Sequence, residues 1–74
     1  MHPLAKWQSD RGLTRAEAAD IIGCKAGTIA DWEYCRRFPS PASISRIVVA
    51  TDDDVTASKL HDAYANSVHE VRHG

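Results

Sequence analysis

Apolar residues recur along most of the chain at intervals of three and four, the spacing that gathers side chains on one face of an α-helix. Glycine, proline or clustered aspartates separate the segments that have this spacing, and no segment alternates polar and apolar residues as a half-buried strand does. The pattern predicts an all-α fold, a small bundle of five helices. We expect these helices over residues 3–11, 15–22 and 25–34, from residue 41 to about 51, and around residues 60–68.

Residues that favour helix ends stand between these segments. Thr14 precedes Glu17 by three positions, which is the spacing of a capping box, where hydroxyl and carboxylate each bind one free backbone N–H. Gly23 suits the left-handed position that ends a helix. Ser40 suits the N-cap and Pro41 the first helical position. The boundaries of the second and fourth helices are therefore predicted from local chemistry.

Three consecutive aspartates, Asp52 to Asp54, interrupt the helical spacing after the fourth segment. Adjacent acids can bind calcium, but the alternating ligands and the glycine of a calcium loop are missing here. We interpret the segment as a solvated turn, followed by Asp54 or Thr56 as the cap of the last helix.

A chain of 74 residues, 43% of them hydrophobic and 26% charged, is typical of one small folded domain. Neither a long apolar segment nor a secretory signal is evident, so we expect a cytoplasmic protein without a membrane span. Cys24 and Cys35 lack the spacing of metal ligands, and we expect a buried free thiol at Cys24 and no cofactor. No nucleophile turn or glycine-rich phosphate loop is present, which argues against an enzyme.

The net charge of −1 is unevenly distributed. Residues 1–50 contain seven basic and five acidic side chains, whereas residues 51–74 contain two and five, so the two parts carry +2 and −3. This asymmetry suggests an interaction surface in the first part of the chain.

Small and apolar residues of the second and third predicted helices have the spacing of a helix-turn-helix. A small residue at position 19 lets the third helix cross closely, and a glycine at position 23 provides the turn. The predicted core of this unit is formed by Ala18, Ala19, Ile22, Gly23, Cys24, Ile29 and Trp32. Two ordinary bundle helices that meet at a glycine are the alternative.

With this motif in place, the chain resembles the Cro-like and xenobiotic-response-element-type helix-turn-helix regulators of phages and bacteria. The resemblance rests on "RGLTRAEAADIIGCKAGTIADWE", on the loop "RRFPSPAS" and on "ISRIVVATDDDVTASKL". It implies a lambda-repressor-like domain over residues 1–68, with residues 69–74 as a frayed tail. It also implies a dimeric repressor that binds palindromic operator DNA, with residues 25–32 in the major groove.

Three positions depart from the pattern of that family. Gln8 stands where relatives often have an arginine paired with the glutamate that corresponds to Glu33, which leaves a hydrogen bond from Gln8 to Glu33 as the expected contact. Arg15 replaces a common glutamine, and Cys35 replaces a glycine. The charge of Arg15 at a helix start favours a phosphate contact.

The resemblance divides the predicted DNA contacts into two sets. The candidates for phosphate contacts are Arg15, Lys25, Thr28, Arg36 and Arg37. The candidates for contacts with base edges are Lys25, Ala26, Gly27, Ala30 and Asp31. Solvated surface residues are the alternative for the charged members, and for Asp31 the alternative is a helix-surface acid that only repels phosphate.

Apolar residues near the C-terminus supply the predicted dimer contact. This set consists of Val49, Leu60, Tyr64 and Val68, and burial in the core is the alternative for each of them. A protein-interaction module that uses the same face is the competing function. His69 and His73 have the spacing of a shared metal site on a helix, although a frayed tail is the simpler interpretation.

Overall fold

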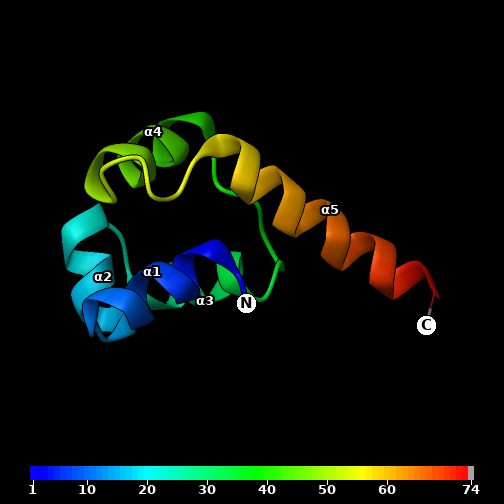
Figure 1. Ribbon diagram of the computed structural model, residues 1–74, viewed down its shortest axis with the longest axis horizontal. Coiled ribbons are helices and arrows are strands. Elements are labelled where there is room, and N and C mark those ends of the chain that lie inside the picture. The colour runs from blue at the N-terminus through cyan, green and yellow to red at the C-terminus, as the bar shows by residue number, and fades with distance from the viewer. Residues whose placement is uncertain (74) are drawn as a thin grey trace.

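The computed structural model describes the backbone of residues 1–73 and the side chains of residues 1–67. It contains five helices and, within these residues, no strand (Figure 1). The all-α prediction is therefore confirmed. The helices are α1 (Pro3–Arg11), α2 (Arg15–Ile22), α3 (Ala26–Glu33), α4 (Pro41–Ala50) and α5 (Ala57–His73).

The helices pack around one core, with α2 in contact with α3 and α4, and α1 in contact with α3 and α5. Figure 1 shows α2 and α4 at one end of the molecule, while the C-terminal half of α5 projects from the other. The core side chains come from all five helices and the α4–α5 connection: Leu4, Trp7, Ala18, Ala19, Ile22, Ile29, Trp32, Ile47, Val55 and Leu60.

Local capping explains where the helices begin and end. The Thr14 hydroxyl accepts from the Glu17 N–H at 3.1 Å, and the Glu17 carboxylate accepts from the Thr14 N–H at 2.9 Å. Gly23 ends α2 with φ of 90°, a left-handed conformation that strains residues with a Cβ atom. The Ser40 hydroxyl accepts from the Ser43 N–H at 3.2 Å and caps α4, which has a proline in its first turn.

The three aspartates form an exposed turn between α4 and α5, as predicted. Asp52 and Asp53 adopt positive φ values of 52° and 65°, which aspartate tolerates better than most residues. Thr56 is the cap of α5, because its hydroxyl accepts from the Lys59 N–H at 3.2 Å. The Lys59 ammonium donates to the Asp54 carbonyl at 2.9 Å and holds the turn against α5.

Two predicted side-chain positions are wrong. Leu60 is 1% exposed and belongs to the core, so it cannot contact a second molecule. Ala26, predicted on the outward face of α3, packs against the core. In both cases the periodicity identified the helix but not which of its faces the neighbouring helices cover.

The backbone of α5 is helical as far as His73, within the segment 69–74 that was expected to be a frayed tail. The predictions for the side chains of Val68, His69 and His73 lie outside the described residues. Among the helices that the structure describes, none has the length and apolar character needed to cross a membrane.

Candidate functional site

The packing of α2 on α3 fixes which side of α3 faces solvent. Ile29 is fully buried and Trp32 is 5% exposed, and both join Ala18 and Ala19 in the core. Alanines at the contact surface of α2 let the two helix backbones approach closely. The side of α3 away from Ile29 and Trp32 remains open.

A tight turn connects the two helices. The N–H groups of Gly23 and Cys24 both donate to the Ala19 carbonyl, at 2.7 and 2.9 Å. Cys24 is a free thiol, half-buried against the core, and burial raises its pKa while the nearby Arg46 charge opposes this. The turn therefore keeps its thiol protonated and unreactive.

The N-terminal end of α3 lacks side-chain partners. Lys25 occupies the N-cap in an extended conformation, and its side chain makes no capping hydrogen bond. Lys25 and Gly27 are both exposed, and a Cβ atom added to Gly27 would meet no other atom within 4 Å. Thr28 is half-buried. This end thus offers a cation, an unobstructed backbone and the first N–H groups of the helix, those of Ala26 and Gly27, whereas the Thr28 N–H donates to the Lys25 carbonyl at 3.0 Å.

The opposite end of α3 is held by hydrogen bonds to Glu33. The Gln8 side-chain amide donates to the Glu33 carboxylate at 2.8 Å, as predicted from the sequence. The Arg15 guanidinium donates to the other carboxylate oxygen at 3.1 Å. The Glu33 side chain is 9% exposed, so this carboxylate is nearly buried and has two partners from α1 and α2.

Two guanidinium groups flank the exposed ring of Tyr34. Arg15 lies 5.7 Å and Arg36 lies 5.1 Å from the ring centroid, within the range of cation–π contacts. Arg36 also donates to the Asp31 carboxylate at 2.9 Å. The hydrogen bond to Glu33 and the charge of that carboxylate raise the pKa of Arg15. Sequence reasoning missed Tyr34, although a tyrosine just beyond a helix and close to arginines was a usable signal.

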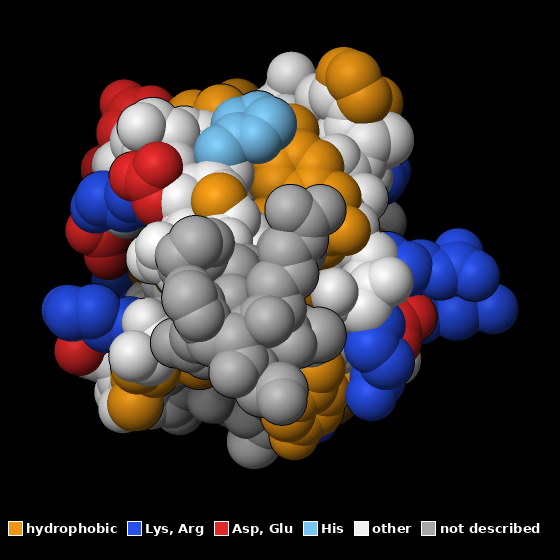
Figure 2. Space-filling view, turned by 90° about the vertical axis from the view of Figure 1, so that its right-hand side faces the viewer, with side chains coloured by type: hydrophobic (Ala, Val, Ile, Leu, Met, Phe, Trp, Pro, Cys, Tyr) orange, Lys and Arg blue, Asp and Glu red, His pale blue; other side chains and the backbone are white. Residues whose placement is uncertain are grey.

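The predicted DNA contacts therefore fall into two groups. Lys25, Gly27 and Arg37 are exposed, and within residues 1–67 neither Lys25 nor Arg37 takes part in an ion pair. Arg15 and Arg36 have carboxylate partners. Figure 2 shows the end from which α5 projects, where Lys and Arg side chains extend from one edge, and acidic and basic side chains alternate at the other.

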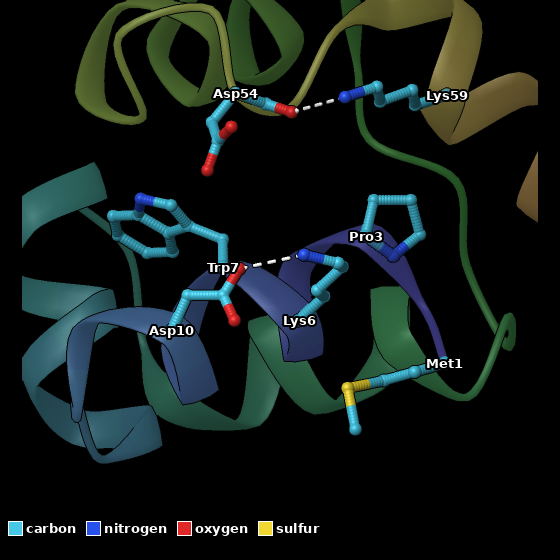
Figure 3. Close-up of a pocket in the computed structure, with 7 residues that line it drawn as sticks. All are labelled: Met1, Pro3, Lys6, Trp7, Asp10, Asp54 and Lys59. Atoms are coloured by element: carbon cyan, nitrogen blue, oxygen red, sulfur yellow. Dashed lines mark hydrogen bonds and ion pairs between the residues drawn. The ribbon is translucent and has the colours of Figure 1, made fainter.

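A separate hollow of about 190 Å³ lies between α1 and the aspartate turn (Figure 3). Lys6 and Asp10 form an ion pair of 2.8 Å along its α1 side, and Figure 3 shows the Asp54 carboxylate turned toward the Trp7 indole. Trp7 is 3% exposed, and its indole N–H has no partner within the described residues. Lys6 has a carboxylate partner here, and Lys59 donates to the backbone carbonyl of Asp54.

In the described part of the chain, no three His, Cys, Asp or Glu side chains gather as metal ligands would. Of the charged residues predicted to contact DNA, Lys25 and Arg37 are those with no ion pair within residues 1–67. The chain matches no model of a known protein family, no curated protein sequence and no solved structure in three comparisons, so the case for a function rests on this geometry.

Proposed function

We propose that the protein binds double-stranded DNA, with α2 and α3 as a helix-turn-helix and the open side of α3 in the major groove. A dimeric transcriptional repressor of the Cro type, acting in the cytoplasm, is the form of this proposal that the sequence favours. The observation that carries it is the bare N-terminal end of α3, where Lys25 and Gly27 are exposed next to a helix start without a side-chain cap.

The base contacts follow from what this end of α3 offers. The major groove admits an α-helix, and lysine donates to guanine acceptors while an alanine methyl packs on a thymine methyl. Lys25 and the half-buried Ala30 are the side chains with these chemistries, and Gly27 lets the backbone approach the bases. Asp31 already accepts from Arg36, so a contact with cytosine would require that pair to open.

The phosphate contacts fall mainly on residues whose charge has no partner. Lys25 and Arg37 are of this kind, whereas Arg15 and Arg36 share their charge with Glu33 and Asp31. Six phosphates neutralised per dimer would give a slope of about −5 for log affinity against log salt concentration. An affinity that does not change with salt would contradict electrostatic binding.

The test begins with selection of bound sequences from random DNA duplexes, followed by titration of the selected duplex. Lys25→Glu and Arg37→Glu should each weaken binding at least tenfold, because each removes a positive charge and adds a negative one beside phosphate. The Arg15→Glu change is unsuitable because it would also break the contact with Glu33. Lys59→Glu makes the same charge change on α5 and is the control, and its melting temperature reports the cost of losing the contact with the Asp54 carbonyl.

Melting temperatures of all variants show whether a loss of binding reflects a loss of fold. If Lys25→Glu and Arg37→Glu keep the wild-type affinity and the wild-type activity in cells, DNA contact is not the function. The protein-interaction module would then be the remaining hypothesis, although the burial of Leu60 removes part of the face predicted for it.

A further inference from the structure

A shallow apolar groove of about 340 Å³ lies between α2 and α4. Its exposed apolar residues are Val49, 81% exposed, and Ile21, 50% exposed. Among the described residues, Met1 and Tyr34 are the other large apolar residues with exposed surfaces, and neither lines this groove. The groove is formed by Ile21, Ile22, Ser45, Arg46, Val49 and Ala50.

Opposite charges lie on the two sides of Val49 along α4. Arg46 precedes Val49 by three residues, about 4.5 Å along the helix axis, whereas Asp52 follows Val49 by three residues in the left-handed turn just beyond the end of α4 at Ala50. Asp53 stands beside Asp52, and the N–H groups of both aspartates bind carbonyls in the last turn of α4. These three charged residues are exposed, and none belongs to an ion pair within residues 1–67.

We propose that a second copy of this chain docks on this groove, with the two α4 helices antiparallel and the twofold axis beside Val49. In this arrangement Val49 of each copy packs on the apolar groove of the other. Because Arg46 lies toward the N-terminal side of Val49 and the aspartates lie toward its C-terminal side, the antiparallel arrangement brings Arg46 of each copy toward Asp52 and Asp53 of the other. A patch that is complementary to itself in this way is what a twofold interface requires.

The helix dipole adds to this complementarity. Asp52 and Asp53 lie at the C-terminal end of α4, where the partial negative charge of the helix disfavours carboxylates. A guanidinium from a second copy neutralises both the carboxylates and the helix end. The Arg46 side chain is available for this role, because its one side-chain hydrogen bond among the described residues is a 3.4 Å contact with the Ser43 hydroxyl.

This dimer differs from the predicted one, which relied mainly on α5. Val49 belongs to both, whereas Leu60, which the predicted dimer included, is buried and takes no part in this one. The contact is small, below about 1,200 Å² in total, and we expect a reversible dimer with a Kd of about 10 to 100 µM. None of the groove residues is among those proposed to contact DNA.

The first test measures the mass of the full chain by sedimentation equilibrium over a range of concentrations, without DNA. The wild type should form a dimer, and Val49→Lys should weaken it at least tenfold, because the change places two like charges at the axis. Ala65→Lys makes the same charge change at an exposed alanine of α5 and should leave the dimer intact. A wild type that is monomeric at about 1 mM, or a Val49→Lys variant with unchanged association, would overturn the proposal.

The second test is a double-mutant cycle between Arg46→Gln and the paired change Asp52→Asn, Asp53→Asn. Asparagine tolerates the positive φ of both positions, so the monomer should keep its fold. Each change alone should weaken the dimer several-fold, and the combined variant should lose little more than either, because the same contacts are removed. Strictly multiplicative losses would show that these groups do not meet.

The two proposals can fail separately. Self-association is measured without DNA, and DNA binding is tested with Lys25 and Arg37, which lie outside the groove. A Val49→Lys variant that associates as strongly as the wild type would overturn the α4 dimer and leave the proposal of DNA binding by α3 in place.

Discussion

The two ends of α3 differ in how many of their polar side chains have partners within the protein. At the C-terminal end, Glu33 binds Gln8 and Arg15, and Tyr34 lies between two guanidinium groups. At the N-terminal end, Lys25 is exposed without a capping contact, and Gly27 faces open space. One end anchors the helix on α1 and α2, while the other keeps its polar groups available to a ligand.

This difference determines which basic residues near α3 can attract an external anion. Four basic residues surround the helix in the sequence, but two of them, Arg15 and Arg36, form ion pairs with acidic residues at its C-terminal end. The charge available to an external anion therefore comes from Lys25 and Arg37. A count of basic residues overestimates the electrostatic attraction, because it ignores which of them already have partners.

The largest effect should follow from removing the anchor of the C-terminal end. Glu33→Ala should lower the free energy of unfolding by about 2 kcal/mol, because two hydrogen bonds to a nearly buried carboxylate are lost. Glu33→Gln, which keeps the shape and loses the charge, should cost about half as much. Urea denaturation measures both, and a loss below about 0.5 kcal/mol would mean that solvent screens these contacts as it does in exposed ion pairs.

At the open end, Gly27→Ala should have the opposite effect on stability. Alanine favours a helix over glycine by about 1 kcal/mol, and the added methyl group has free space around it. The variant should therefore be more stable in urea denaturation, yet bind the selected DNA more weakly because the methyl group separates backbone and bases. Unchanged DNA affinity would show that the backbone at Gly27 does not approach the groove.

A smaller effect is expected at Cys35, just beyond the anchored end. This residue has φ of 57°, and its thiol makes long contacts of 3.9 and 4.0 Å with the carbonyls of Ala63 and Glu33. Cys35→Gly removes the strain of a left-handed residue and also these contacts, so we expect a net gain of about 0.5 kcal/mol. Cys35→Asn is the control, and destabilisation of the glycine variant would show that the thiol contacts outweigh the strain.

The smallest effect should come from His2, which caps α1 beside the anchored end. Its Nδ1 atom accepts from the Leu4 N–H at 3.1 Å, which requires the neutral imidazole. Burial lowers the pKa of His2 from 6.5, against the opposing effect of Glu33. The unfolded chain therefore takes up the proton first, so this contribution to stability is present above about pH 6.5 and is lost as the pH falls through the folded pKa.

His2→Asn keeps an acceptor at the cap and removes the titration. The melting temperature of the wild type should fall between pH 7 and pH 5 by more than that of the variant. Equal pH dependence of both proteins would assign the effect to other titrating groups.

The local features of the fold were predictable because their causes lie within a few residues. The capping box of Thr14 and Glu17 and the turn at Gly23 appear at the predicted positions. The bounds of α1 and α2 also agree with the prediction, whereas α3 begins and ends one residue inside its predicted range. The hydrogen bond from Gln8 to Glu33 was predictable only through the family that the chain resembles.

From the sequence we predicted the helix of the candidate site and its exposed lysine, but not which arginines form ion pairs within the protein. Arg15 was expected to contact phosphate, yet in the structure it donates to a carboxylate 18 positions away. The helix-turn-helix pattern used for the sequence prediction has arginine at the position of Gln8 and glutamine at that of Arg15. Here the two residue types are exchanged, and both still reach Glu33.

The sequence by itself determined the helices, their caps and the small residues where α2 meets α3, because these depend on side chains acting on the adjacent backbone. Tertiary structure decided which exposed groups remain free: it buried Leu60, gave Arg15 and Arg36 their partners and placed Ile21 beside Val49. The reason is physical, since a charge or an apolar side chain is available for binding only when no distant part of the chain has folded against it.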